Sequence, residues 1–288
     1  MNDKNTLLFY AFDWDDNILN MSSEIIALND KDEEVGIETH DFSKYRSIIG
    51  KKQFKYKGHI IVSYPMINDS IDFDRAYRNF MDRPDPRAFI RDTKKTLLEK
   101  NYGPSWNDFI ECIVNGSLFS IITARGHEPD IIKEGVEYIV NTELSDDQKF
   151  IMYNNLLKFI HIFEKYNSDH FSKVSTEEIF TDNPLVTEYL SNCEYIGVSA
   201  DSRGGSPESP EEAKREVLID FKRRVNNFAK SVGMMAKIGF SDDDKKNIKE
   251  IEDLIHNLDH EEFSHISHYV VKNTNDPNNI SKKVRIIK

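Results

Sequence analysis

Three carboxylates stand directly behind an apolar run near the start of the chain. The run LLFYAF occupies residues 7–12, and Asp13, Asp15 and Asp16 follow it at once. Carboxylates this close repel one another and are costly to remove from water, so they form either a solvated turn or the surroundings of a cation. A second acidic cluster, residues 242–244, follows another apolar run. If the two clusters meet, their oxygens are the ligands that Mg²⁺ prefers.

A hydroxyl and a lysine complete a set of groups suited to phosphoryl transfer. Thr123 ends the apolar run 118–123, and Lys214 lies early in a helical segment. Beside a cation, Asp13 would attack the phosphorus of a phosphoester and form an aspartyl-phosphate. Asp15 would protonate the leaving oxygen and then activate water. Thr123 and Lys214 would hold the phosphoryl oxygens and offset developing charge.

Each of these signals also has a simpler explanation. The acids at 13–16 could form an exposed turn or a calcium-binding loop, although Ile18 stands where such a loop requires glycine. The acids at 242–244 suit the first turn of a helix, with Ser241 as its cap. Lys214 could be an ordinary solvated lysine of a helix. Only the convergence of all the groups at one place would favour the chemical interpretation.

Apolar runs of strand length alternate with helical patterns along the chain. The predicted strands are residues 7–12, 118–123, 195–200, 234–240 and 267–271. The predicted helices are residues 85–101, 128–141, 145–166, 209–232 and 243–258. This alternation predicts an α/β fold with a mainly parallel sheet. Because ligands of such sheets bind beyond the carboxyl ends of the strands, we expect the acids, the hydroxyl and the lysine to meet there.

The first two predicted strands are separated by about 100 residues, far more than one crossover helix needs. Within this interval, residues 45–65 alternate in hydrophobicity and contain two glycines, which predicts a β-hairpin. We therefore predict a core of residues 1–20 and 86–288, with a cap inserted at 21–85. The run KKQFKYK, residues 51–57, is the most basic stretch. It indicates either an edge strand protected by lysines or a surface that stacks bases and meets phosphates.

The motifs, in this order, resemble those of the haloacid dehalogenase (HAD) superfamily of phosphohydrolases. The family has a hydrophobic strand followed by DxD, a strand ending in Ser or Thr, a lysine, and a strand followed by an acidic pair. The matching residues are Asp13 with Asp15, Thr123, Lys214, and Asp242 with Asp243. The resemblance implies a Rossmann-like three-layer sandwich with strand order 5-4-1-2-3, often with a cap after the first motif. The sequences DWDDNIL and GFSDDDKKN also resemble those of uncharacterised HAD-like proteins common in phage genomes.

Three positions leave the details of the resemblance open. Asn17 stands where the family has Thr or Val, and its side chain retains the ability to form local hydrogen bonds. Lys214 is separated from its strand by the Gly/Ser/Pro-rich segment 201–210, so Lys222 is an alternative phosphate-binding lysine. Arg125, in the sequence TARG, either reaches the phosphate or lies at the surface.

The composition narrows the class of protein. The 288 residues are 39% hydrophobic and 31% charged, which is typical of a globular protein. The net charge of −12 argues against a broad DNA-binding surface. Cys112 and Cys193 form no CxxC pair, so we expect no disulfide framework. No apolar stretch approaches the roughly 20 residues that span a bilayer, and none resembles a signal peptide. We expect a cytoplasmic protein, in the host cytoplasm if phage-encoded, with no membrane partner.

The expected activity is Mg²⁺-dependent hydrolysis of a phosphomonoester through an aspartyl-phosphate on Asp13. The resemblance implies that the metal is held by Asp13, Asp242, Asp243 and the backbone carbonyl of Asp15. The expected substrate is a phosphorylated small molecule or a nucleotide. Two alternatives remain: a polynucleotide-end phosphatase guided by residues 51–57, and a catalytically silent HAD-like scaffold that binds a partner. The sequence leaves the substrate and the oligomeric state open.

Overall fold

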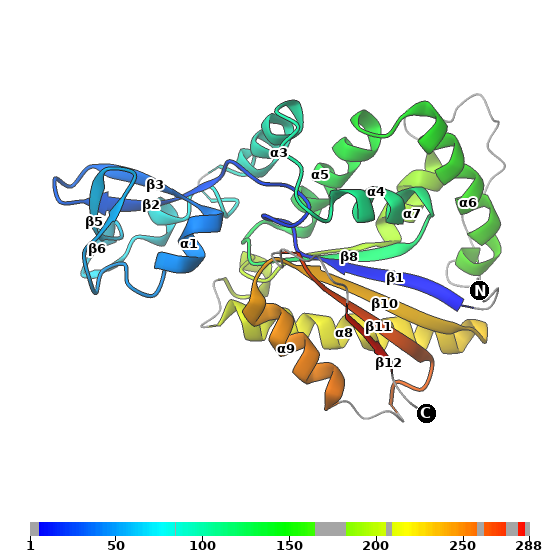
Figure 1. The fold of residues 1–288 in the computed structure, drawn as a ribbon. Coiled ribbons are helices and arrows are strands. Elements are labelled where there is room, and N and C mark those ends of the chain that lie inside the picture. Colours follow the sequence, from blue (N-terminus) through cyan, green and yellow to red (C-terminus); the bar gives the residue numbers. More distant parts are fainter. Residues whose placement is uncertain are drawn as a thin grey trace.

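A six-stranded sheet forms the centre of the molecule (Figure 1). The computed structural model describes residues 6–83, 85–164, 183–205, 209–257, 262–274 and 282–285. The five parallel strands are β1 (Thr6–Phe12), β8 (Leu118–Thr123), β9 (Glu194–Gly197), β10 (Met235–Asp242) and β11 (Ile266–Asn273). A sixth strand, β12 (Lys282–Arg285), pairs antiparallel with β11. The order across the sheet is β12-β11-β10-β1-β8-β9.

Helices cover both faces of this sheet, as Figure 1 shows. On one face lie α3 (Ala88–Leu98), α4 (Trp106–Val114), α5 (Pro129–Thr142), α6 (Asp146–Glu164) and α7 (Pro184–Asn192). On the other lie α8 (Pro210–Val232) and α9 (Lys245–His256). Consecutive residues of a strand point to opposite faces, and in β1 Phe12 joins one apolar cluster while Ala11 joins the other. The predicted α/β fold with a mainly parallel sheet is therefore confirmed, and the three layers are compatible with a Rossmann-like fold.

A second, smaller unit lies between β1 and α3. Its main sheet has the order β3-β2-β5-β4. Its elements are β2 (Glu24–Asn29), β3 (Glu34–Glu38), α1 (Thr39–Tyr45), β4 (Phe54–Tyr56), β5 (His59–Ser63), β6 (Met66–Ile67), β7 (Ser70–Ile71) and α2 (Phe73–Ala76). Residues such as Ile25, Ile37 and Ile61 give it an apolar cluster of its own. In Figure 1 the unit lies beyond the end of the central sheet at which β1 finishes.

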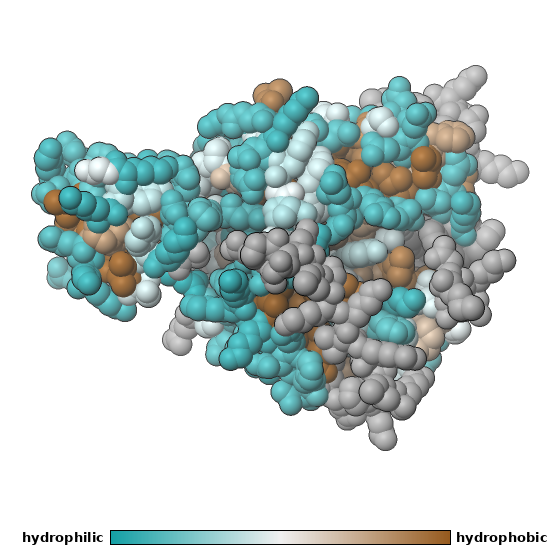
Figure 2. Space-filling model, viewed as in Figure 1, coloured by the Kyte–Doolittle hydropathy of each residue, from teal (hydrophilic) through white to brown (hydrophobic). Residues whose placement is uncertain are grey.

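The basic run 51–57 contains an edge strand. β4 is the last strand in its sheet and pairs with β5 alone, so the predicted hairpin and its position at an edge are both confirmed. Lys57 and Gly58 join the two strands with φ values of 45° and 88°. Positive φ at both central residues is the geometry that matches the twist of a hairpin. Figure 2 shows a mostly hydrophilic surface over the second unit, interrupted by a few apolar side chains.

Several elements differ from the sequence-based expectations. The strand predicted at 195–200 ends at Gly197, and a short 3-10 helix follows at Asp201–Arg203. The hairpin of β2 and β3, the helices α1, α4 and α7, and the C-terminal strand β12 were not predicted. Residues 165–166 and 258 of predicted helices, and residues 206–208 of a predicted loop, lie outside the described residues.

Within the described part of the chain, we find no helix with the length and apolar character needed to cross a membrane.

Candidate active site

The two acidic clusters predicted from the sequence meet at the carboxyl ends of adjacent strands. Asp13 follows β1 and Asp242 ends β10, and the two chains are held in register by a 3.1 Å hydrogen bond from Asp13 N to Ser241 O. Each of Asp13, Asp242 and Asp243 offers a carboxylate oxygen within 4.8 Å of the others. Asp13 and Asp242 are buried, and Asp243 is half-buried. Residues separated by most of the chain thus form one cluster.

Lys214 is the cation of this cluster. Its Nζ lies 3.0 Å from Asp13 Oδ2 and 3.1 Å from Asp242 Oδ2, and its side chain is buried. Burial lowers the pKa of Lys214, but the carboxylates of Asp13 and Asp242 raise it by more, so the net shift is upward. The lysine reaches the site because α8 begins nearby, capped by the Ser209 side chain, which accepts from Glu212 N at 3.2 Å.

One lysine does not satisfy the three carboxylates. Burial raises the pKa of Asp13 well above its ordinary value, and the neighbouring Asp242 and Asp243 add to the rise that Lys214 opposes. Burial and then Asp242 raise the pKa of Asp243 to about 7. Asp13 Oδ1 is buried and accepts no hydrogen bond from the described residues. An unpartnered buried oxygen amid surplus negative charge fits a divalent cation with oxygen ligands.

Asp242 is fixed by the start of α9. Asn247 Nδ2 donates to both oxygens of Asp242, at 3.0 and 2.9 Å, and Asp244 N donates to Oδ1 at 2.8 Å. Asp244 itself caps α9, accepting from Lys246 N at 2.8 Å. The expectation that Ser241 caps this helix is wrong, because β10 continues through Asp242. The cap therefore lies three residues later than expected, at Asp244, and Asp242 stays in the strand.

Asn17 ties three parts of the site together. Its Nδ2 lies 3.0 Å from Asp13 O and from Ser241 Oγ, and its Oδ1 accepts from Thr274 Oγ1 at 3.0 Å. The segments that follow β1, β10 and β11 are thus joined through one buried amide. Gly103 packs on the same loop, where an added Cβ would lie 2.4 Å from Asn17 O. Asparagine at this position therefore has a structural role that Thr or Val could not reproduce.

Asp15 and Thr123 form a second group beside the cluster. Arg125 binds Asp15 through Nε at 2.8 Å and Nη2 at 2.6 Å, and Thr123 Oγ1 lies 3.4 Å from Asp15 Oδ2. Arg125 is 1% exposed, so a surface role for it is wrong. The structure brings together the DxD acid, the hydroxyl and this arginine, and it turns Asp15 toward Arg125.

Lys222, the alternative lysine, lies elsewhere. Its Nζ is buried, faces the rings of Phe263 at 5.2 Å and Tyr269 at 4.5 Å, and has no hydrogen-bond acceptor among the described residues. Burial lowers the pKa of Lys222 to about 7, and the Glu262 carboxylate opposes this shift only in part. The acidic cluster contains Lys214 and not Lys222.

The buried position of Lys222 leads to a stability prediction. Because its folded pKa lies below its unfolded value, the unfolded chain binds more protons between about pH 7 and 10.5, and stability rises with pH over that interval. We expect Lys222→Met to raise the free energy of unfolding by roughly 2 to 4 kcal/mol at pH 7, and by less at pH 10. Urea titrations at both pH values measure this, with exposed Lys230→Met in the same helix as control. No gain at pH 7 would contradict it.

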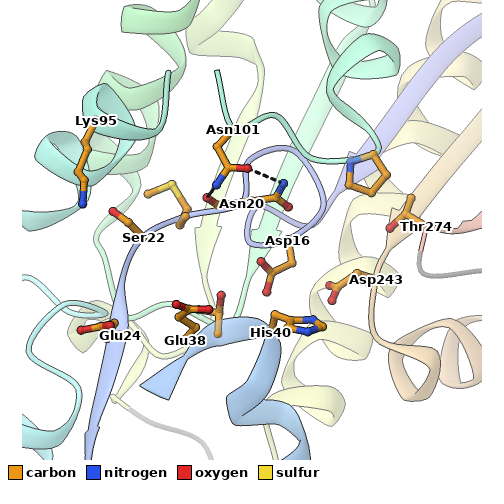
Figure 3. Close-up of a pocket in the computed structure, with 13 residues that line it drawn as sticks. Asp16, Asn20, Ser22, Glu24, Glu38, His40, Lys95, Asn101, Asp243 and Thr274 are labelled. Atoms are coloured by element: carbon orange, nitrogen blue, oxygen red, sulfur yellow. Dashed lines mark hydrogen bonds between the residues drawn. The ribbon is translucent and has the colours of Figure 1, made fainter. Parts of the chain in front are cut away.

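A cavity of about 690 Å³ opens between the cluster and the second unit (Figure 3). Its lining carboxylates are Asp16, Glu24, Glu38 and Asp243, and its basic residues are His40 and Lys95. Burial and then Asp15 raise the pKa of Asp16 to about 6. No residue of the basic run 51–57, all of which the structure describes, lines the cavity. The cavity is thus acidic and bordered by both units, and Asp243 is the member of the cluster that lines it.

Sequence reasoning missed the residues that support the acids. Asn17 was noted only as a departure from a motif, and Asn247 was not noted at all. The signal for Asn247 is a polar residue in the first turn of a helix, five positions after a strand-end acid. For Arg125 the sequence holds no comparable signal, because its partners come from three separate segments.

Comparisons with protein-family models, with curated proteins and with solved structures gave no match to this chain.

Proposed function

We propose that the protein is a Mg²⁺-dependent phosphohydrolase of HAD type that acts on a phosphomonoester. The observation that carries the proposal is the meeting of Asp13, Lys214, Asp242 and Asp243 at the ends of two adjacent parallel strands. Two features of the fold support it. Numbered in chain order, the five parallel strands follow the order 5-4-1-2-3, and the second unit is inserted where a cap would be.

Each residue of the site would have its own role in phosphoryl transfer. Asp13 Oδ1, which lacks a partner, would attack the phosphorus and form an aspartyl-phosphate while the bond from phosphorus to the leaving oxygen breaks. Asp15 would give a proton to that oxygen and later take one from the water that attacks the same phosphorus. Lys214 and Thr123 would bind the phosphoryl oxygens. When bound by Asp13, Asp242, Asp243 and the Asp15 carbonyl, Mg²⁺ would supply positive charge to offset that of the phosphate.

The cavity favours a small phosphorylated molecule over a polynucleotide end. A nucleic-acid strand brings many phosphates, and four carboxylates line the space that it would enter. The hairpin lysines lie at the edge of the second unit's sheet and outside the cavity lining. If replacing Lys52 and Lys55 lowers turnover of a 3′- or 5′-phosphorylated oligonucleotide but not of a mononucleotide, the polynucleotide alternative gains support.

A panel of phosphomonoesters tests the proposed function. Purified protein with Mg²⁺ is incubated with sugar phosphates, amino-alcohol phosphates, nucleotides and p-nitrophenyl phosphate, and released phosphate is measured. We expect Mg²⁺-dependent release from at least one ester. No release from any ester, together with no binding of beryllium fluoride, would support the silent scaffold instead.

A further inference from the structure

A buried arginine joins Asp15 to the chain segments that lead into and out of the second unit. Both Asp15 oxygens accept hydrogen bonds from Arg125, at 2.8 and 2.6 Å. Nη2 of Arg125 also donates to Ser23 Oγ at 2.8 Å, just before β2, and Nη1 donates to the Asn79 carbonyl at 3.0 Å, after α2. The guanidinium therefore contacts one residue of the active site and one residue of each connecting segment.

The two connecting segments are also bound to each other and to the core. Asn79 Nδ2 donates to the Glu24 carbonyl at 3.1 Å, and Ser23 Oγ donates to Asp92 Oδ2 at 2.5 Å in α3. The guanidinium carbon of Arg125 lies 4.5 Å from the Phe80 ring, which belongs to the returning segment. Arg125 is buried, so these bonds are shielded from water in this arrangement. A displacement of either segment must therefore move Arg125 or break its bonds.

The bonds to Asp15 have a consequence for catalysis. Arg125 donates to each of the two Asp15 oxygens, so the two-bond pair fixes the orientation of the carboxyl group as well as its place. Under the proposed function, Asp15 has to turn from Arg125 toward the phosphoryl group before it gives its proton. The only side chains within hydrogen-bond reach of the Asp15 carboxylate, among the interactions that the structure describes, are Arg125 and Thr123.

We propose that Arg125 is a positioning residue that makes the orientation of Asp15 follow the placement of the second unit. The proposal rests on the proposed function, in which Asp15 is the acid and base. In the arrangement seen here Arg125 holds Asp15 in place. Movement of the Ser23 and Asn79 segments would shift the guanidinium and allow Asp15 to turn.

A kinetic experiment tests the link between Arg125 and Asp15. Phenyl phosphate has a poor leaving group that needs a proton, whereas p-nitrophenolate leaves readily without one. With Mg²⁺ present, we expect Arg125→Leu to lower kcat for phenyl phosphate about tenfold more than kcat for p-nitrophenyl phosphate, with KM little changed. Arg125→Lys keeps the positive charge but loses the planar pair of donors that binds both Asp15 oxygens. Its kcat for phenyl phosphate should therefore lie between those of Arg125→Leu and wild type. The control is Arg87→Leu, which removes an exposed two-bond pair with Glu134.

A distance measurement tests the link to the second unit without requiring activity. Nitroxide labels are attached through Met66→Cys in the second unit and Leu98→Cys on α3, where the native side chains are 50% and 81% exposed. Both native cysteines are buried, so the reagent does not reach them in the folded protein. We expect Arg125→Leu and Ser23→Ala to broaden the distribution of label distances, and Arg87→Leu to leave it unchanged. Ser23→Ala removes one small hydroxyl and serves if Arg125→Leu does not fold.

The outcomes separate the two proposals. Equal loss of kcat for both esters, or an unchanged distance distribution in Arg125→Leu and in Ser23→Ala, overturns the positioning role. If the wild-type protein turns over neither aryl ester and no other ester of the panel while the distributions still broaden, the proposed function fails, and the link between Arg125 and the second unit stands. Selective loss on phenyl phosphate with broadened distributions supports both.

Discussion

Replacing Asp13 with asparagine should abolish Mg²⁺-dependent phosphate release while the protein stays folded. The amide has no nucleophilic carboxylate oxygen, so we expect kcat to fall on the order of 10⁴- to 10⁶-fold, as when a nucleophile is removed from other enzymes. Asparagine has nearly the same shape, and its oxygen retains the ability to accept from Lys214 Nζ. Phosphate release is measured on the best ester of the panel.

The stability of the same variant provides an independent measurement. Asp13 is a buried acid whose pKa is raised, so removing its charge relieves repulsion with Asp242 and Asp243. Without metal, we expect Asp13→Asn to unfold at a temperature no lower than wild type. Saturating Mg²⁺ should stabilise the wild type by about 2.7 kcal/mol at 100 times the dissociation constant, and the variant by much less.

The matched control for this variant is Asp244→Asn, which makes the same acid-to-amide change in the second acidic cluster, residues 242–244. Asp244 caps α9, and asparagine is as good a cap. Its activity should stay close to that of wild type. Equal activity of Asp13→Asn and wild type would contradict the assignment of Asp13 as nucleophile.

Replacing Lys214 with methionine should destabilise the protein by roughly 3 to 5 kcal/mol at pH 7 in the absence of metal. The change removes the ammonium that lies 3.0 Å from Asp13 and 3.1 Å from Asp242, and leaves buried carboxylates without their cation. Lys230→Met, on the exposed side of α8, should change stability by much less. Urea titration in a chelator measures both.

The decrease in the free energy of unfolding caused by Lys214→Met should depend on pH. The pKa of Asp243 is already about 7 when folded, against 3.8 for an ordinary aspartate, so the folded state binds more protons than the unfolded state between about pH 4 and 7. Stability therefore falls as pH rises through that interval, and we expect a smaller loss at pH 5 than at pH 7. Mg²⁺ should restore part of the stability that Lys214→Met removes. An unchanged stability at pH 7 would contradict the arrangement of charges described here.

The parts of the fold that the sequence predicted are those with an unbroken apolar signal. β8 is buried along nearly its whole length and β1 contributes to the apolar clusters on both faces, so their residues form short continuous apolar runs next to acids and a threonine. The site acids were visible for the same reason, since each follows such a run. Lys214 was predicted as the lysine of the site, with Lys222 as the alternative. The spacing of the two lysines along one helix does not tell which of them faces the carboxyl ends of the strands.

The parts that the sequence did not predict depend on contacts between distant segments. Arg125 stands in a polar loop, where an arginine is usually exposed, and it is buried only because the second unit's connecting segments cover it. Asn17 bonds to Thr274, 257 residues away. The strands β2 and β3 are short and have mixed faces, so their pairing is visible only once the second sheet has formed.

The central position of β1 has a consequence for how the chain folds as it is synthesised. β1 lies between β8, which is made before the middle of the chain, and β10, which is made in its last quarter. At about 5 to 20 residues per second, the 229 residues from Asp13 to Asp242 (242 − 13) take roughly 10 to 45 seconds to emerge. β1 is able to pair with β8 once residue 123 has been made, but its other edge stays unpaired until β10 emerges. The second unit, whose strands are contiguous in the chain, has all its partners present long before and is free to fold first beside it.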